Sequence, residues 1–82
     1  MEPAVAFGRV LRRLRRKKGY TQEELGFEAD LRRTFVSVLE LGQQQPSLTT
    51  ILKLARVLDT RPGKILDLVE QEIQEFSGGG ER

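Results

Sequence analysis

The sequence predicts a compact all-α protein of five short helices, for three reasons. Apolar residues recur at spacings of three and four in five successive stretches, which is the period of a helix, and no stretch alternates as a strand does. Residues that start or stop helices separate these stretches: Pro3 and Pro62 suit first helical positions, and Gly19 and Gly42 suit positions just past helix ends. The length of 82 residues allows one domain with a thin core.

The first helix is expected over residues 3–18. Phe7, Leu11 and Leu14 recur at spacings of four and three with Val10 beside them, which makes one apolar stripe. Cations cover the remaining faces: Arg9, Arg12, Arg13, Arg16 and Lys17. Two interpretations of this basic cluster stay open, because it either meets phosphates of an anionic partner or simply faces solvent.

Residues 22–41 predict a helix-turn-helix, two short crossed helices that share one apolar face. Thr21 and Glu24 can form a capping box, which starts the first of these helices at Gln22. Gly26 allows the two helix backbones to approach closely, and Asp30 falls at the tight corner. The apolar residues expected between the two helices are Leu25, Ala29, Leu31, Val36 and Leu39.

The third helix is expected from Arg32 or Arg33 to Leu41. Its start is the least defined of the five, because arginine is a poor N-cap residue. After a polar loop, the fourth helix should cover residues 48–58. Its inner face is expected to carry Ile51, Leu54, Ala55 and Leu58.

The fifth helix should begin at Pro62 and continue to about Phe76. The remaining residues, 77–82, include three consecutive glycines and nothing apolar to bury. A segment of this composition is expected to be a disordered tail.

The composition excludes several classes of function. The chain contains no cysteine and no histidine, so thiolate metal sites, cysteine nucleophiles and histidine bases are all impossible. An enzyme, a cofactor and a metal are therefore not expected, and no segment is left over to hold a small-molecule ligand. The sequence has no stretch of about 20 apolar residues and no apolar leader, so we expect a cytoplasmic protein without a membrane partner.

The charge is distributed unevenly along the chain. Residues 9–33 hold nine lysines and arginines against four acidic residues, whereas residues 67–82 hold five acidic residues against one arginine. This asymmetry indicates one basic face for an anionic partner and one acidic end kept away from it.

Three motifs together resemble the Cro/repressor-type (XRE-type) helix-turn-helix family. They are FGRVLRRLRRKKGYTQEEL, LRRTFVSVLELG and PSLTTILKLARVLD, and the resemblance extends from about residue 7 to residue 66. Within that family, the segment LRRTFVS is most similar to the controller proteins of restriction–modification systems. The resemblance implies a repressor-type five-helix fold and sequence-specific binding of double-stranded DNA.

The third helix is the expected reading element, since a helix in the major groove presents its first side chains to base edges. An arginine can donate two hydrogen bonds to a guanine, and threonine and valine can pack against a thymine methyl. The expected base-contacting residues are Arg33, Thr34, Ser37 and Val38. For Arg33, the alternative is a solvated surface arginine. Phe35 is expected to pack into the core.

The phosphate contacts are expected around the reading helix. Gln22 matches the family's phosphate-binding glutamine, and the start of a helix favours an anion through its free N–H groups and its dipole. A plain surface glutamine is the alternative. The further candidates for phosphate contact are Arg32, Gln43, Gln44, Ser47 and Thr49.

The resemblance also implies a structural salt bridge between Arg15 and Glu40, which would tie the first helix to the reading helix. Three residues depart from the family pattern. Asp30 stands where glycine is usual, Val38 is often polar in relatives, and Leu41 is often basic.

The last helix predicts a homodimer. Leu66, Val69, Ile73 and Phe76 follow a spacing of three, four and three, which is typical of a seam between paired helices. Ile65 and Leu68 would then seal the core of the monomer. Alternatively, Ile73 and Phe76 fold back on their own domain. Two-fold pairing would place two reading helices about 34 Å apart over an operator with inverted half-sites.

The predicted organisation is a DNA-binding domain over residues 1–66, a dimerisation extension over residues 67–76 and the tail. The leading hypothesis for the function is a small dimeric transcription regulator. The alternative is an antitoxin or protein-interaction module that uses the last helix to bind another protein and binds DNA only for autoregulation.

Overall fold

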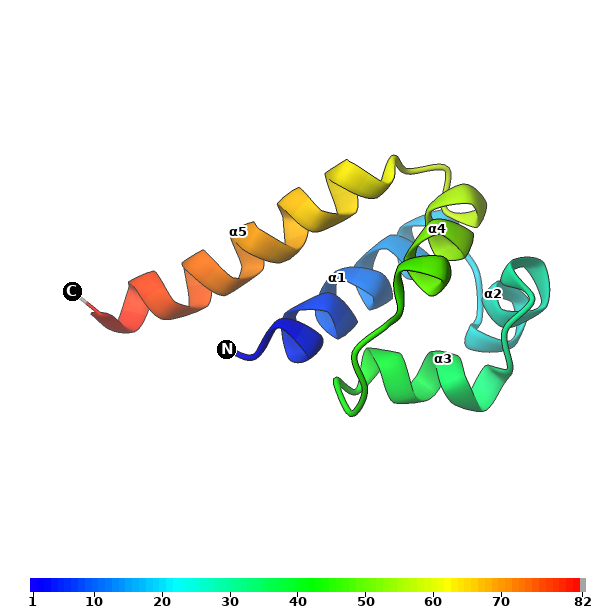
Figure 1. The fold of residues 1–82 in the computed structure, drawn as a ribbon, viewed down its shortest axis with the longest axis horizontal. Helices are drawn as coiled ribbons and strands as arrows, with labels where there is room; N and C mark the ends of the chain where they lie inside the picture. The colour runs from blue at the N-terminus through cyan, green and yellow to red at the C-terminus, as the bar shows by residue number, and fades with distance from the viewer. Residues whose placement is uncertain (82) are drawn as a thin grey trace.

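The structure, a computed structural model, describes the backbone of residues 1–81 and the side chains of residues 1–76. This part of the chain folds into five α-helices and contains no strand, so the all-α prediction is confirmed (Figure 1). The helices are α1 (Pro3–Lys18), α2 (Gln22–Ala29), α3 (Arg33–Glu40), α4 (Leu48–Val57) and α5 (Pro62–Glu81).

Local signals account for most helix ends. Gly19 ends α1 in the left-handed conformation with φ of 83°, where a side chain would be strained. The capping box at the start of α2 is present, because the Thr21 hydroxyl accepts from the Glu24 N–H and the Glu24 carboxylate accepts from the Thr21 N–H. Asp30 takes the left-handed conformation at the corner with φ of 58°, which aspartate adopts more readily than most residues other than glycine.

The helix boundaries differ from the predicted ones mainly at the carboxyl ends. Helices α3 and α4 each end one residue earlier than expected, since their last predicted residues are C-caps. Helix α5 is longer, because its backbone is helical to Glu81 and not only to Phe76. The prediction of a disordered tail falls on residues 77–82, whose side chains lie outside the described part, and it stays a prediction.

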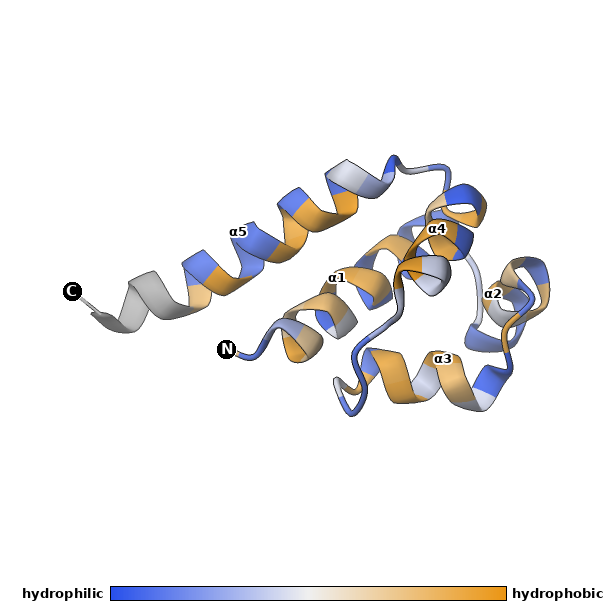
Figure 2. Ribbon diagram, viewed as in Figure 1, coloured by the Kyte–Doolittle hydropathy of each residue, from blue (hydrophilic) through white to orange (hydrophobic). Residues whose placement is uncertain are grey.

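One apolar core joins all five helices. Its buried members come from each helix, and apolar residues are interspersed with polar ones along the helices (Figure 2). Five apolar residues that were expected to point inward are only partly buried against this core: Leu14, Leu31, Phe35, Ile51 and Leu68. Helix α1 lies at the centre, with α3 on one side and α5 running alongside it in the opposite direction (Figure 1). The buried hydrophobic residues are Ala6, Phe7, Val10, Leu11, Leu25, Ala29, Val36, Leu39, Leu54, Ala55, Leu58, Ile65 and Val69.

Two glycines allow the close contacts that shape this core. A Cβ added to Gly8 would lie 2.5 Å from the carbonyl oxygen of Leu39, so α1 and α3 touch backbone to backbone. A Cβ added to Gly26 would lie 2.7 Å from the carbonyl oxygen of Leu31, as expected for a helix-turn-helix corner. The Gly26 carbonyl also accepts a hydrogen bond of 2.8 Å from the Leu31 N–H, which closes this corner.

The prediction that Val69 belongs to a dimer seam on α5 is wrong. The Val69 side chain is only 8% exposed and belongs to the core of the monomer, and Ile73 is half-buried against that core. Phe76 is exposed at the edge, with the Arg9 guanidinium 5.4 Å from its ring centre. The physical reason is that α5 packs along α1, so the three-and-four spacing serves this contact within one chain. Of the four predicted residues, Leu66 and Phe76 are therefore exposed, and Val69 and Ile73 pack on the core.

Candidate nucleic-acid interface

Helix α3 presents the expected reading residues to solvent. Val36 and Leu39 point into the core, and this fixes the opposite face of the helix outward. The residues of the outward face differ in exposure: Arg33 and Thr34 are exposed, and Ser37 and Val38 are half-exposed. The packing of α3 therefore leaves all four predicted base-contacting side chains accessible.

Sequence reasoning missed one residue of this outward face. Leu41 lies seven residues after Thr34, which is about two helical turns, and therefore on the same side of the helix. Its side chain is 64% exposed, although it is large and apolar. The signal in the sequence was the departure from the family's usual basic residue. Phe35, in contrast, is half-buried and packs against the core.

The predicted pair of Arg15 and Glu40 is present between α1 and α3, and it is bidentate. The Arg15 Nε donates to one carboxylate oxygen of Glu40 and the Nη2 donates to the other at 3.0 Å. The two side chains are 11% and 4% exposed. The hydrogen bond and the charge of Glu40 raise the pKa of the Arg15 guanidinium, although burial opposes this shift. The pair is thus a fixed, fully charged link between α1 and α3.

Gln22 is the first residue of α2 and lies beside this pair. Its side-chain amide nitrogen donates a hydrogen bond of 3.1 Å to the Oε1 atom of Glu40. The Gln22 side chain is half-buried. Gln22 is also the first residue of α2, and the free N–H groups at the start of a helix attract an anion.

The other phosphate candidates all lie on the surface, near the start of α3, in the loop between α3 and α4, or in the first turn of α4: Arg32, Gln43, Gln44, Ser47 and Thr49. Ser47 differs from the rest because its hydroxyl is occupied. It accepts a hydrogen bond of 3.1 Å from the Thr50 N–H and donates one of 3.1 Å to the Thr50 Oγ1, which caps α4. The Ser47 hydroxyl is therefore engaged in the cap of α4. The other four candidate side chains are freer to contact a phosphate.

The basic cluster of α1 divides into two groups. Arg13 and Arg9 bind the Glu72 carboxylate on α5 at 2.8 and 3.5 Å. The hydrogen bond from Arg13 is the main cause that lowers the pKa of Glu72, against the opposing effect of desolvation. Arg12 and Arg16 remain exposed on α1. Two members of the cluster are thus held by the acidic last helix.

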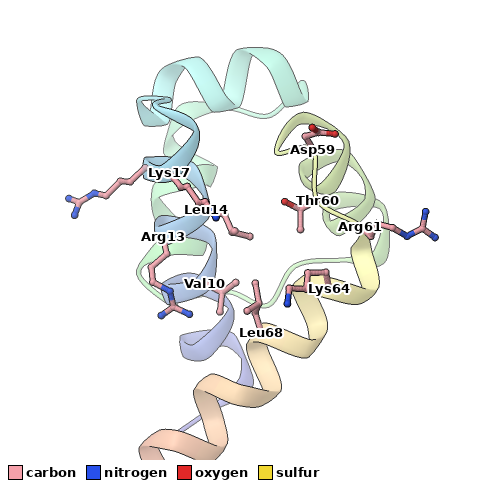
Figure 3. A pocket seen from close by; sticks show the side chains of 10 residues that line it. Val10, Arg13, Leu14, Lys17, Asp59, Thr60, Arg61, Lys64 and Leu68 are labelled. Atoms are coloured by element: carbon pink, nitrogen blue, oxygen red, sulfur yellow. The ribbon is translucent and has the colours of Figure 1, made fainter.

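A groove between α1 and the α4–α5 connection lies away from the helix-turn-helix. Val10, Leu14 and Leu68 form its apolar floor, and Lys17 and Lys64 are among the cations around it (Figure 3). Lys17 follows Gly8 by nine residues, about two and a half helical turns, and so lies on the opposite side of α1 from the α3 contact. This groove is therefore separate from the reading face.

The described residues contain neither a membrane-spanning helix nor a metal-binding group of side chains. No helix in this part of the chain is both long enough and apolar enough to span a membrane. Among the side chains that the structure describes, no group of acidic residues is arranged to hold a metal ion.

Comparison with known proteins identifies the family. The model of a helix-turn-helix family matches residues 11–65, which is most of the folded part of the chain. The chain belongs to this helix-turn-helix family. The expected resemblance to the Cro/repressor type is thereby confirmed, and the protein is a DNA-binding transcription regulator.

The relatives agree with this assignment. The chain is 40% identical to the control protein C.BamHI of Bacillus amyloliquefaciens over 62 residues, which cover 74% of this chain and 76% of that protein. It is 47% identical to the restriction-modification controller protein C.AhdI from Aeromonas hydrophila, with a TM-score of 0.73 over 76% of this chain and 94% of the other. The clp gene regulator ClgR from Corynebacterium glutamicum shares the fold, with a TM-score of 0.92 at 22% identity over 96% of this chain and 84% of the other.

Proposed function

We propose that the protein is a controller-type regulator that binds, as a homodimer, a double-stranded operator with inverted half-sites. The observation that carries this proposal is the outward face of α3, on which Arg33, Thr34, Ser37 and Val38 are accessible while Val36 and Leu39 hold the helix to the core. The likeness to two control proteins of restriction–modification systems supports the controller role.

In the proposed complex, α3 enters the major groove with its amino end leading. Arg33 donates to a guanine, and Thr34 and Ser37 contact neighbouring base edges. Val38 and the exposed Leu41 form an apolar strip toward the other end of the helix, and this strip fits thymine methyl groups. The half-site should therefore contain a guanine followed by thymines on one strand.

Phosphates on either side of the groove would be bound by Gln22 at the start of α2 and by Arg32, Gln43, Gln44 and Thr49 around α3. Arg32 is the only one of these side chains that carries a charge. Each phosphate neutralised by a cation adds about 0.9 to the slope of log affinity against log salt. A shallow salt dependence is therefore expected for this part of the interface.

The dimer contact needs a different surface from the predicted seam. Leu66 of α5 lies near α4, where Leu48 and Leu52 are also exposed and lie one helical turn apart. Leu66 and Ile51 line the same hollow, and on α4 Leu48 is three residues before Ile51 and Leu52 directly follows it. We propose that Leu48, Leu52 and Leu66 form the contact patch of the dimer. Covering a leucine side chain contributes about 1.5–3 kcal/mol, which would offset part of the cost of association.

A substitution in this patch tests the dimer. We expect wild-type protein to sediment as a dimer at micromolar concentration and Leu52→Glu to sediment as a monomer with an unchanged circular dichroism spectrum. Phe27→Glu on α2 is the matched control, because Phe27 is equally apolar and even more exposed but lies on another helix. A monomeric wild-type protein, or a dimer that survives Leu52→Glu, would remove this interface.

The operator is found by selecting bound duplexes from a random pool at a stated salt concentration. The expected result is one enriched motif with two inverted halves whose centres are about one DNA turn apart. Enrichment of a single half-site would contradict the dimer, and the absence of any enriched motif would contradict sequence-specific binding.

The alternative function, a protein-interaction module that uses the last helix, has less support. It needs the face from Leu66 to Phe76 to be free, but Val69 is buried and Ile73 packs against the core of the same chain. We also propose that the protein has no catalytic activity and works in the cytoplasm. The lack of histidine and cysteine supports the first statement, and a DNA target is consistent with the second.

A further inference from the structure

The Glu40 carboxylate on α3 contacts one residue of α1 and one residue of α2. The Glu40 Oε1 atom accepts two hydrogen bonds, one of 3.0 Å from the Arg15 Nη2 on α1 and one of 3.1 Å from the Gln22 Nε2 on α2. Glu40 itself is the last residue of α3 and its side chain is 4% exposed. The Glu40 carboxylate thus links the start of α2, the end of α3 and the last turn of α1.

This contact restricts how the Gln22 amide can point. A side-chain amide nitrogen carries two N–H groups, and Glu40 accepts from one of them. The other N–H is left to donate to a further acceptor, and Gln22 opens α2, whose leading backbone N–H groups have no partner within the helix. The capping box uses the N–H of Glu24, so the preceding positions are the ones that can face an anion.

Arg15 makes this arrangement compatible with a phosphate. A bare carboxylate next to the amide would repel a phosphate at the same helix end. The bidentate ion pair neutralises that charge, and Arg15 also donates a hydrogen bond of 2.9 Å to the Tyr20 carbonyl, just before α2 begins. Arg15 therefore supports both the carboxylate and the segment that leads into the phosphate-binding turn.

We propose that Glu40 is a positioning residue for DNA binding, which acts through Gln22. It holds the Gln22 amide in the orientation that binds a phosphate. This inference rests on the proposed function, because it needs DNA to lie against α2 and α3.

The first experiment measures binding to duplexes in which one phosphate at a time is replaced by a neutral methylphosphonate. With wild-type protein, we expect one position per half-site to weaken binding about tenfold through the loss of a Gln22 hydrogen bond. Gln22→Ala should abolish the effect at that position, and Glu40→Ala, which removes the acceptor of the Gln22 amide, should abolish it there and leave the effects at other phosphates intact.

A purely structural role of Glu40 predicts a different pattern. In that case Glu40→Ala would weaken binding to all duplexes by a common factor, keep the methylphosphonate effect at the Gln22 position, and cost as much in the Gln22→Ala background as in wild type. Either observation would overturn the inference. If wild-type protein binds no selected duplex at all, the proposed function itself fails.

A second measurement needs no substitution at Glu40 and so does not depend on whether that variant folds. In the nuclear magnetic resonance spectrum of free wild-type protein, the Gln22 side-chain amide should be rigid on the picosecond to nanosecond timescale. The exposed Gln43 and Gln44 serve as controls within the same molecule. An amide of Gln22 as mobile as theirs would show that Glu40 does not hold it.

Discussion

Helix α1 makes arginine–glutamate contacts on two sides, and the two sides differ in kind. Toward α3, Arg15 and Glu40 form a bidentate pair whose side chains are 11% and 4% exposed. Toward α5, Arg9 and Arg13 reach Glu72 from side chains that are 51% and 56% exposed. The arginine–glutamate pair toward α3 is therefore buried, whereas solvent screens the pairs toward α5. We expect the α3 side to determine whether the domain folds and the α5 side to make only a small adjustment.

The largest expected effect comes from breaking the buried pair. Arg15→Ala leaves the Glu40 carboxylate buried without its partner and should lower the free energy of unfolding by about 3–5 kcal/mol. Arg13→Ala is the control on the other side of α1, with an expected loss of less than about 1 kcal/mol. Urea unfolding followed by circular dichroism measures both, and equal losses would contradict the contrast between the two sides.

The next effect tests the backbone contact on the same side. Gly8→Ala places a Cβ 2.5 Å from the Leu39 carbonyl oxygen, which must push α1 and α3 apart and should cost about 1–3 kcal/mol of unfolding free energy. Gly63→Ala, in the first turn of α5, meets nothing within 4 Å and should be neutral or stabilising by up to about 1 kcal/mol. Thermal unfolding of the two variants gives the comparison, and an unchanged Gly8→Ala protein would contradict the close packing.

A third substitution compares an unpaired arginine with a paired one in DNA binding. Arg33→Ala should weaken binding to the selected operator by about 1–3 kcal/mol and relax the preference at one base pair. Arg13→Ala should change affinity little, because Glu72 already neutralises Arg13. Titration of the operator and of single-base variants measures this. If Arg33→Ala weakens binding to all sequences equally, Arg33 contacts a phosphate instead of a base.

The smallest effect concerns the pH dependence of the α5 contact. Glu72 has a pKa below its ordinary value because Arg13 donates a hydrogen bond to it, so the folded state binds the proton less readily than the unfolded chain. Its contribution to stability is therefore complete above the ordinary pKa of a glutamate and is lost as the pH falls through the lowered value. Glu72→Gln should be less stable than wild type by under about 1 kcal/mol at pH 7.

The same pair of proteins should become equally stable at a pH well below the pKa of Glu72, where wild type has lost the charge as well. Urea unfolding of both proteins between pH 7 and pH 3 follows this convergence. A stability difference that stays constant over the whole range would mean that the charge of Glu72 is not the cause.

The helix-turn-helix was predictable because its signals are local. The capping box at Thr21, the small Gly26 and the left-handed Asp30 each act within a few residues, and the structure shows all three as expected. The apolar residues at helical spacing also determined which side of α3 faces the core. The reading face is simply the opposite side, so four candidate base contacts were accessible where the sequence placed them.

The role of α5 could not be read in the same way. A spacing of three and four indicates only that one face of a helix is apolar. It does not indicate which partner covers that face. Val69 and Ile73 are covered by the same chain because α5 runs along α1. Likewise, Arg9 and Arg13 looked equivalent to Arg12 and Arg16 until α5 brought Glu72 beside two of them.

The sequence alone therefore determined the helices, the turn between α2 and α3, the inward face of each short helix and the family, since these depend on the identity of neighbouring residues. Only the tertiary structure decided which surfaces remain free: that Leu66 with Leu48 and Leu52 is exposed whereas Val69 is not, and that the Gln22 amide is held by Glu40. These outcomes depend on side chains of different helices that meet only when the helices pack, as Gln22 and Glu40 do across 18 residues of the chain.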